Sequence, residues 1–379
     1  MNVTKQKKIL FLVSGMEEGG AERVASLLCN YWVEKGYKVT LMPTYSGRGD
    51  CVYDINDNVN ISFLSDILGS TKNNFWSRVR RFILLRKVIL NEAPDVIVSF
   101  LAQVNVTAIL AAIGTYIPVI VSERTYPPQY PIGFIWTILR RITYPLASAI
   151  VMQTNQGLDW LKDECPRGRG FVISNPITFP MSVGKPIVET TRIVEDKKNI
   201  CLAVGRLDEG KRFIEIINVF SGLAREFTNW DLVFLGDGEE RAALEKEAIV
   251  SGLQERIHLP GRVGNLGDWY ERANLFVLNS RFEGFPNVLL EAMAHGVPCV
   301  SVDCDTGPRD LISSEENGLL IPNNSSKHLR SSMEILMRDI TLARALGQSA
   351  KEVREKFSIN TIGAEWDALI ASCLMNPRI

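Results

Sequence analysis

Short apolar runs alternate with amphipathic stretches along the whole chain. In the first half the apolar runs lie at 9–13, 39–42, 96–99, 119–121, 149–152 and 171–173, and helical patterns between them include 21–34, 75–90, 104–113 and 132–144. The second half repeats the scheme, with apolar runs at 200–204, 231–235, 257–259, 275–278, 298–302 and 318–321. Continuous apolar runs separated by helices are typical of parallel strands buried on both faces. The pattern therefore predicts an α/β protein with two doubly wound, Rossmann-like sheets.

The length of 379 residues is too great for one ordinary core. Segment 176–198 is rich in Pro, Thr and charge and has little periodicity, which is typical of a linker. We expect an N-terminal domain at 1–175, a linker at 176–198, a second domain at 199–358, and a C-terminal helix at 359–379 that packs back on the first domain. Two such sheets that face each other would bind ligands in a cleft at the carboxyl ends of their strands.

Composition and charge narrow the class of protein. The chain has 42 basic and 43 acidic residues, with the basic excess in its first half, which suits an anionic partner there. The seven cysteines are scattered without a CxxC pair, which favours reduced thiols over a disulfide framework or a zinc site. The apolar run near the start is too short for a signal peptide, and no run reaches membrane-spanning length. We expect a cytoplasmic protein with no nucleic-acid partner.

Three segments after predicted strands carry candidate chemistry. Gly19 and Gly20 form a glycine turn before a helix, where backbone N–H groups can approach a phosphate, although simple turn chemistry gives the same pattern. Arg206 and Lys211 follow the first strand of the second half, where an Arg can fork onto phosphate oxygens and a Lys adds a point charge. The alternative for these two cations is a solvated loop bonded to Asp208.

The segment Glu283-Gly-Phe-Pro-Asn-Val-Leu-Leu-Glu291 follows the predicted strand at 275–278. Gly284 and Pro286 predict a tight turn, and Asn287 is a plausible helix cap. Two carboxylates here could accept strong hydrogen bonds from hydroxyl groups of two sugars. Alternatively, Glu283 would complement the helix dipole and Glu291 would be a surface charge.

In this order these motifs resemble the large retaining glycosyltransferase family 4 of GT-B fold, across essentially the whole chain. The matching segments are Gly19-Gly-Ala-Glu-Arg23, Gly205-Arg-Leu-Asp-x-x-Lys211, Gly236-Asp-Gly-Glu239, Gly261-Arg-Val263, and Glu283 with Glu291. Within the family, the chain most resembles bacterial enzymes that extend lipid-linked glycans, such as N-acetylgalactosamine, capsule and O-antigen transferases. The segment Thr306-Gly-Pro-Arg-Asp310 strengthens this resemblance.

The resemblance implies a role for each matched residue. Arg206 and Lys211 would hold the nucleotide diphosphate, Glu291 the ribose, and Glu283 the donor sugar. Arg262 and Val263 would flank the base. The phosphates would be surrounded by Gly19, Gly20, Gly284, Phe285, Pro286 and Asn287. No metal or other cofactor is expected, because the two cations and the helix N-termini take the part of a divalent ion.

One departure from the family concerns the segment Ser122-Glu123-Arg124, where many members have a His as the third residue. The histidines of this chain, 258, 295 and 328, all lie in its second half. Glu123 or Arg124 would therefore replace that His. An Arg cannot act as a base at neutral pH, so an electrostatic or positioning role is expected for Arg124.

The stretch 74–90 combines a helical apolar pattern with several basic residues and no acid. Such a one-signed face indicates an anionic surface or ligand, although a core helix with basic exposed positions gives the same pattern. The resemblance implies that Lys72, Arg78, Arg80 and Arg81 contact an undecaprenyl-diphosphate-linked glycan at the inner face of the cytoplasmic membrane.

Two other functions share this pattern. A nucleotide-sugar epimerase has the same two-domain architecture, but the first half offers it no histidine. A two-lobed sugar-binding protein would have an export signal and no use for Arg206, Lys211 and two spaced glutamates.

Overall fold

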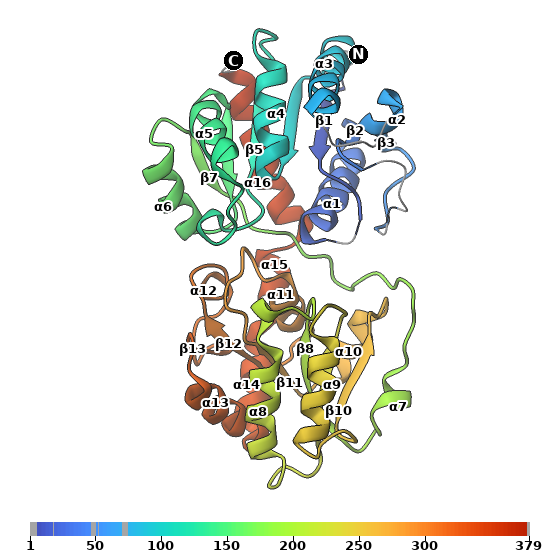
Figure 1. Cartoon of the computed structure of the whole chain (residues 1–379), viewed down its shortest axis with the longest axis vertical. Helices are drawn as coiled ribbons and strands as arrows, with labels where there is room; N and C mark the ends of the chain where they lie inside the picture. The colour runs from blue at the N-terminus through green and yellow to red at the C-terminus, as the bar shows by residue number, and fades with distance from the viewer. Residues whose placement is uncertain (1–5, 18, 47–50, 52, 70–74, 377–379) are drawn as a thin grey trace. The chain divides into compact units, whose positions relative to one another are not determined.

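The computed structural model describes residues 6–17, 19–46, 51, 53–69 and 75–376 (Figure 1). The chain divides into two compact units. Unit 1 comprises Met1–Pro176 and Ile359–Ile379, and unit 2 comprises Ile177–Ser358. No helix among the described residues is both long and apolar enough to cross a bilayer.

Unit 1 is built on a parallel sheet of seven strands in the order β3-β2-β1-β4-β5-β6-β7. Its strands are β1 Lys8–Val13, β2 Lys38–Pro43, β3 Asn60–Ile61, β4 Val96–Phe100, β5 Val119–Ser122, β6 Ala149–Met152 and β7 Gly170–Val172. Every residue of β4, β5 and β6 is buried, as the continuous apolar runs predicted.

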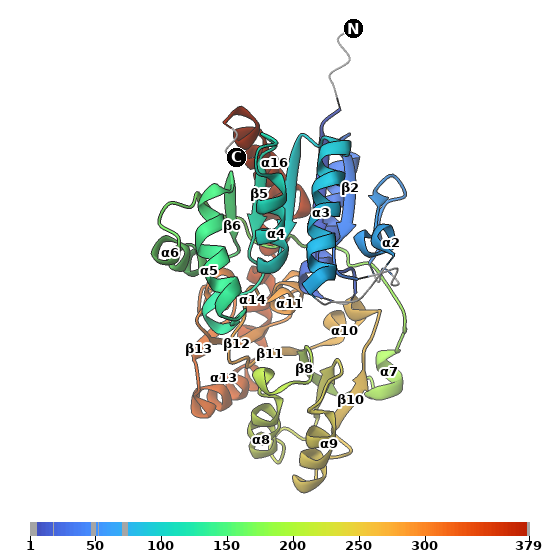
Figure 2. The same cartoon turned by 45° about the horizontal axis from the view of Figure 1, so that its top comes forward.

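The helices of unit 1 cover both faces of this sheet (Figure 2). Their bounds are α1 Gly20–Glu34, α2 Leu64–Leu68, α3 Phe75–Glu92, α4 Ala102–Ala112, α5 Phe134–Thr143, α6 Asn155–Glu164 and α16 Ile359–Met375. Helix α4 packs between α3 and α5, whereas α16 packs on α1. Right-handed crossovers place the α3, α4 and α5 layer on the sheet face opposite α1.

Helix α16 is tied to α1 by both apolar and polar contacts. The buried Trp366 ring meets Trp32 edge to face at a centroid distance of 6.2 Å. The Asp367 carboxylate accepts hydrogen bonds from Tyr31 Oη at 2.9 Å and from Trp32 Nε1 at 3.1 Å. The last helix therefore completes the core on one face of unit 1.

Unit 2 has a parallel sheet of six strands in the order β10-β9-β8-β11-β12-β13. Its strands are β8 Asn199–Val204, β9 Trp230–Leu235, β10 Ile257–Gly261, β11 Leu275–Leu278, β12 Cys299–Asp303 and β13 Leu319–Pro322. Its helices are α7 Thr190–Ile193, α8 Phe213–Leu223, α9 Arg241–Val250, α10 Leu266–Arg272, α11 Asn287–His295, α12 Pro308–Leu311, α13 Ser326–Arg338, α14 Ile340–Ala350 and α15 Val353–Lys356. Both units thus have the predicted doubly wound fold.

The segment 177–198, which lacks a periodic pattern, belongs to unit 2. The buried Asn265 side chain accepts a hydrogen bond from the Val188 N–H and donates one to the Val188 carbonyl, both at 3.0 Å. Trp269 Nε1 donates to the same carbonyl at 3.2 Å. Gly184 N–H donates to the Gly264 carbonyl at 2.8 Å. Backbone contacts of this kind leave no apolar signature in the sequence of the segment itself.

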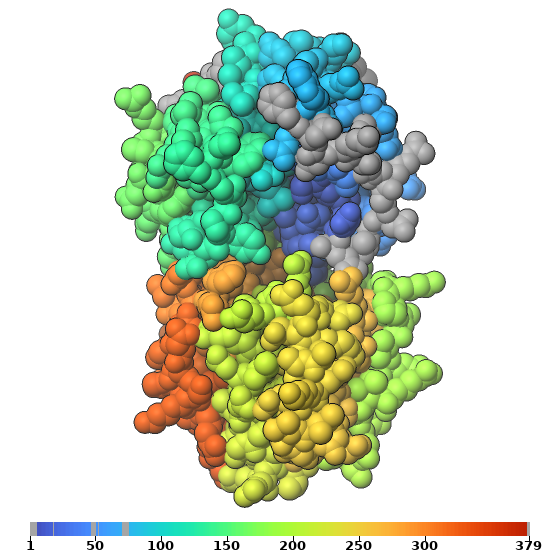
Figure 3. Space-filling view, in the orientation of Figure 1, coloured from blue at the N-terminus to red at the C-terminus, as the bar shows by residue number. Residues whose placement is uncertain are grey.

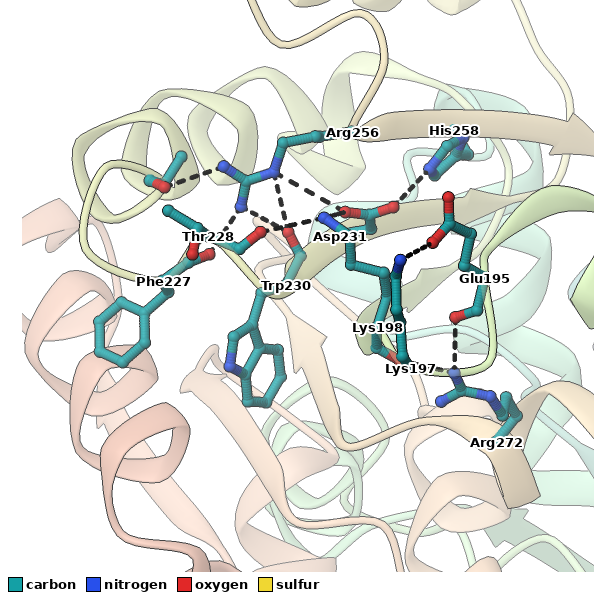
Figure 4. Close-up of polar contacts among 11 residues, drawn as sticks. Glu195, Lys197, Lys198, Phe227, Thr228, Trp230, Asp231, Arg256, His258 and Arg272 are labelled. Atoms are coloured by element: carbon teal, nitrogen blue, oxygen red, sulfur yellow. Dashed lines mark hydrogen bonds and ion pairs between the residues drawn. The ribbon is translucent and has the colours of Figure 1, made fainter.

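A cluster of charged residues connects the amino ends of β8, β9 and β10 (Figure 4). The buried Asp231 carboxylate lies 3.0 Å from His258 Nε2, 3.6 Å from Lys198 Nζ and 3.7 Å from Arg256 Nε. The Arg256 guanidinium also donates to backbone carbonyls of Ala224, Phe227 and Trp230, at and beyond the end of α8. The cluster lies at the end of the strands opposite the candidate motifs, which indicates a structural role.

Candidate functional site

Apart from Asn287 and Glu291, which belong to α11, the candidate residues of unit 2 lie on loops after the carboxyl ends of β8, β9, β10, β11 and β12. Two of these loops touch through glycine. A Cβ added to Gly236, which has a φ of +134°, would lie 1.9 Å from the Gly205 carbonyl oxygen, and one added to Gly238 would lie 2.4 Å from the Leu207 oxygen. Only glycine allows this approach. The close contact explains why the segment Gly236-Asp-Gly lies after β9.

Lys211 and Glu283 form the central ion pair of this edge. Lys211 Nζ lies 2.6 Å from Glu283 Oε1, and the two side chains are 21% and 12% exposed. Burial disfavours the charged amine, but the Glu283 carboxylate, with Asp208 nearby, outweighs burial and raises the pKa of Lys211. The structure therefore joins two candidate residues that are far apart in sequence.

The Arg206 side chain is exposed and makes no hydrogen bond or ion pair with any described residue, while its backbone carbonyl accepts a hydrogen bond from the Asp208 N–H at 2.9 Å. The alternative of a loop in which both cations bond to Asp208 is wrong in its contacts, because Lys211 bonds to Glu283 instead. Arg206 thus presents a guanidinium beside a strand end where a phosphate can be bound.

The turn after Glu283 is held by the loop that follows β12. Thr306 Oγ1 donates to the Glu283 carbonyl. A Cβ on Gly307, whose φ is +95°, would lie 2.6 Å from Pro286 Cδ. The prediction that Asn287 caps the helix is wrong, since the N-cap is Pro286 and α11 has no side-chain cap. The proline restricts the backbone at this cap, so Asn287 becomes the first residue of the helix.

Glu291 is not a surface charge. It is only 2% exposed, and Tyr270 Oη donates to its Oε2 at 3.0 Å and to the Val288 carbonyl at 3.2 Å. Burial and this phenol fix the carboxylate in one orientation. Four residues on, His295 Nδ1 lies 2.8 Å from the Glu291 carbonyl oxygen, a helical contact that indicates a structural role for this histidine.

The candidate residues for the base lie beyond β10. Arg262 is exposed and Val263 is half-buried, directly after Gly261, whose φ is +88°. The Gly261 carbonyl accepts a hydrogen bond from Gly236 N–H at 2.9 Å, so the loops after β9 and β10 are joined.

In unit 1 the glycine turn before α1 already has an anionic group. Gly19 is the N-cap of α1, and Gly20 is the first helical residue. The Glu22 side chain folds back over Gly19, since a Cβ added there would lie 2.1 Å from Glu22 Oε2. Burial raises the pKa of Glu22, and its own backbone N–H acts in the opposite direction. This carboxylate lies at the helix start where the sequence predicts a phosphate.

Arg124 is buried over an aromatic ring. Its Cζ lies 4.2 Å from the centroid of Phe100, and its Nη2 donates to Asn175 Oδ1. Gln153 Nε2 donates to the same oxygen at 2.7 Å. Burial lowers the pKa of Arg124, and the Glu22 carboxylate acts in the opposite direction. The guanidinium is thus held rigidly at the carboxyl end of β5.

Glu123 points into the core of unit 1. It accepts a hydrogen bond from Tyr144 Oη, and Arg140 Nη1 lies 3.6 Å from its Oε1. Burial raises the pKa of Glu123, while Arg140 and Tyr144 act in the opposite direction. The contacts of Glu123 are those of a structural group, which leaves Arg124 as the candidate for the position of the family's His.

The basic residues predicted to contact an acceptor point in different directions. Lys72 lies outside the described residues. Arg78 and Arg80 are exposed on α3, whereas Arg81 is 4% exposed and lies 5.3 Å from the Tyr45 ring centroid. None of the three guanidinium nitrogens of Arg81 has a hydrogen-bond partner among the described residues. The three described cations therefore do not form one cluster.

Sequence reasoning missed Arg212, which connects several loops of unit 2. Its Nε donates to the Asn279 carbonyl at 2.9 Å and its Nη2 to the Ser280 carbonyl at 3.2 Å. It also bonds to the side chains of Asn323 and Asn324. The sequence shows a basic residue after Lys211. The partners of Arg212, however, follow β11 and β13 and are far away along the chain.

Among the described residues no group of three His, Cys, Asp or Glu side chains is placed to hold a metal ion. Asp303 is the first residue of the segment Asp303-Cys-Asp305. It forms an ion pair with Arg309, in which Arg309 Nε lies 2.8 Å from Asp303 Oδ1.

Comparisons with known proteins agree with this arrangement. Residues 18–178 match the family described as Glycosyltransferase Family 4, and residues 189–353 match the family described as Glycosyl transferases group 1. The chain is 29% identical over 366 residues, 96% of its length and 98% of the relative's, to a GalNAc-α-(1→4)-GalNAc-α-(1→3)-diNAcBac-PP-undecaprenol α-1,4-N-acetyl-D-galactosaminyltransferase of Campylobacter jejuni.

Solved structures show the same fold. Sucrose-phosphate synthase from Thermosynechococcus elongatus superposes with a TM-score of 0.81 at 17% identity, over 98% of this chain and all of that one. Anabaena Alr3699/HepE in complex with UDP superposes with a TM-score of 0.77 at 16% identity, over 96% of this chain and all of that one.

Proposed function

Because the chain belongs to the glycosyltransferases of GT-B fold, with a family 4 domain at 18–178 and a group 1 domain at 189–353, we propose that it moves a sugar from a nucleotide sugar to a lipid-linked glycan with retention of configuration. The observation that carries the proposal is the Lys211 and Glu283 pair, 2.6 Å apart on the carboxyl edge of unit 2. One member of the pair suits a diphosphate and the other suits sugar hydroxyls.

The proposed donor is a UDP-hexose or a UDP-N-acetylhexosamine. In support, the Campylobacter relative is named an N-acetylgalactosaminyltransferase, and the Anabaena structure holds UDP. Arg206 and Lys211 bind the diphosphate, Glu291 binds the ribose, and Glu283 binds the transferred sugar. Arg262 and Val263 flank the base. The turn at Gly284, Phe285, Pro286 and Asn287 supplies backbone groups for the phosphates.

We propose that transfer needs no metal ion. As the diphosphate leaves, negative charge develops on its β-phosphate, and the Arg206 guanidinium and the Lys211 amine are placed to stabilise that charge. The raised pKa of Lys211 keeps its amine charged at neutral pH. Glu283 is a binding and positioning group for the sugar while the acceptor hydroxyl attacks the face that the diphosphate leaves.

The proposed acceptor is an undecaprenyl-diphosphate-linked glycan at the inner face of the cytoplasmic membrane, in bacterial surface polysaccharide or glycoprotein biosynthesis. Such a lipid is in the printed name of the Campylobacter relative. The buried guanidinium of Arg81, which has no hydrogen-bond partner among the described residues, is a candidate group for the acceptor diphosphate, since a buried cation gains most from an anionic partner. Arg78 and Arg80 add exposed positive charge on the same helix. Arg124 of unit 1 has an electrostatic role.

The test combines product analysis with binding. The protein is incubated with UDP-sugars and a synthetic lipid-diphosphate glycan, with and without EDTA, and the anomeric configuration of the product is read by NMR. Glu283→Ala should suppress transfer at least about tenfold while sparing UDP affinity, whereas Glu291→Ala should weaken UDP binding by calorimetry. Glu245→Ala, on the exposed surface of α9, is the matched control.

Three results would overturn the proposal. An inverted product would exclude retention, and a requirement for a divalent ion would exclude the role given to the two cations. Release of an epimerised nucleotide sugar without acceptor would show an epimerase instead.

A further inference from the structure

Five exposed side chains of helix α3 lie along one line of its surface. Trp76, Arg80, Ile83, Lys87 and Leu90 follow one another at alternating intervals of four and three residues, and all five are exposed. This spacing keeps them on one face of a helix. The exposed fractions of the three apolar members are 71% for Trp76, 49% for Ile83 and 55% for Leu90. The outer face of α3 therefore alternates apolar and basic residues.

Helix α5 exposes a second apolar line. Phe134 is 80% exposed, Ile135 is 70%, Ile138 is 38% and Ile142 is 62%. On its other face the same helix buries Arg140, which lies 4.6 Å from the Trp160 ring centroid and beside Glu123. Four large apolar side chains of α5 are thus exposed, beside the exposed Arg141, which pairs with Glu164.

The two lines belong to one surface. Helix α4 packs between α3 and α5, and this helical layer faces the viewer in the space-filling view of unit 1 (Figure 3). We call the outward side chains of α3, α4 and α5 the helical face. Helix α4 has no charged residue, α5 has no acid, and the one acid in α3 is Glu92, its last residue. Solvated helices such as α9, Arg241–Val250, mix both signs.

We propose that the helical face docks unit 1 on a bilayer that contains anionic phospholipid, with the apolar side chains inserted at the level of the headgroups. The inference deepens the proposed function and rests on it, because a lipid-linked acceptor is reached at a bilayer. The basic members of the α3 line lie between apolar ones, so their long stems can follow the apolar residues inward while the charges meet lipid phosphates. Trp76 is of the type enriched at the headgroup level.

A partner protein would satisfy such a face less well. Trp76, Phe134 and Ile135 lie in the first turns of α3 and α5. Helices that connect parallel strands begin at the carboxyl edge of the sheet, so these three side chains lie towards that edge. The apolar residues are spread over two separate helices rather than gathered in one pocket, which suits a flat fluid surface better than an anchor and its socket.

The test is flotation of the full chain with vesicles of phosphatidylcholine alone and of equimolar phosphatidylcholine and phosphatidylglycerol. We expect binding to the anionic vesicles and weak binding to the neutral ones. The variant Phe134→Ser/Ile135→Ser/Ile142→Ser should lower the bound fraction relative to free protein at least about tenfold. Lys87→Gln should lower binding to anionic vesicles about fivefold and leave binding to neutral vesicles unchanged.

The matched control is Ile249→Ser/Val250→Ser, which removes two side chains of 66% and 70% exposure from unit 2 and should leave vesicle binding unchanged. Failure of the wild-type chain to float, or equal flotation of the triple variant with an unchanged melting temperature, overturns the proposal. Light scattering that shows a dimer for the wild type and a monomer for the triple variant also overturns it, because a second copy would then cover the face.

Activity separates this inference from the proposed function. With a short-chain, water-soluble diphosphate-linked acceptor the triple variant should match the wild type, whereas on vesicle-embedded acceptor it should be slower. Vesicle binding without transfer to any acceptor would refute the proposed function and leave the docking face standing. Transfer without vesicle binding would refute the docking face and leave the proposed function unaffected.

Discussion

Replacing Arg212 by Gly tests whether one side chain holds together the loops that carry the donor residues. Arg212 has a φ of +50°, a left-handed conformation that costs a non-glycine residue about 1 kcal/mol. Gly removes that cost. It also removes the hydrogen bonds to the Asn279 and Ser280 carbonyls, at 2.9 and 3.2 Å, and those to two asparagine side chains.

The magnitude follows from these two opposing terms. A hydrogen bond from a charged donor contributes about 1.5–3 kcal/mol, so the two backbone bonds together contribute about 3–6 kcal/mol. After the relief of about 1 kcal/mol, Arg212→Gly should destabilise unit 2 by about 2–5 kcal/mol. Arg212→Ala loses the same bonds and keeps the strain, so it should be about 1 kcal/mol less stable than Arg212→Gly.

Calorimetry gives the stability of each variant, and hydrogen exchange of peptides that cover residues 275–291 shows where it is lost. Exchange should accelerate in this segment and not in the strands of unit 1. UDP affinity should fall as well, because Lys211, which we propose binds the diphosphate, directly precedes Arg212 in the chain. If Arg212→Gly melts with the wild type, or if Arg212→Ala is the more stable of the two variants, the loops do not depend on this guanidinium.

Three further outcomes can be checked on purified protein. Gly236→Ala should lose more than about 3 kcal/mol by calorimetry because its Cβ meets the Gly205 carbonyl at 1.9 Å, whereas Gly252→Ala, with a φ of +70° and open space around it, should lose about 1 kcal/mol; equal losses would contradict the loop contact. Arg256→Met should cost about 2–4 kcal/mol by breaking the carbonyl bonds and the pair with buried Asp231, while Arg338→Met, an exposed double ion pair, should stay within about 1 kcal/mol. Burial, with the hydrogen bond to Asp367, raises the pKa of Tyr31 to about 12, so its stabilising effect is complete below about pH 10 and is lost as the pH rises towards 12. Tyr31→Phe should remove that part of the pH dependence of the melting temperature, and an unchanged slope would exclude Tyr31 as its source.

The fold was predictable because its strands are buried on both faces. The run at 96–99 became β4, Val96–Phe100, in which every position is buried. Strand β3, Asn60–Ile61, was missed because both of its residues are exposed and carry no apolar signal. Its position depends on pairing with β2, which a local pattern does not contain.

The site was predictable where it depends on strand ends and not where it depends on distant partners. Parallel topology places Lys211 and Glu283 at one edge, so the sequence could name both. The burial of Glu123 depends on Tyr144 and Arg140, which a later helical segment brings to it. The different directions of Arg80 and Arg81 could have been found from the helical period, since Ser77, Arg81, Leu85 and Ile89 are spaced four apart and all buried.

The return of α16 to unit 1 sets the order in which the chain can fold during synthesis. Unit 2 is one uninterrupted stretch, whereas the α1 surface around Trp32 lacks Trp366 and Asp367 until the last residues are made. The unit that leaves the ribosome first is therefore completed last, and its apolar face must be kept from aggregation in the meantime. A truncation at the C-terminus consequently acts on the folding yield of the N-terminal unit.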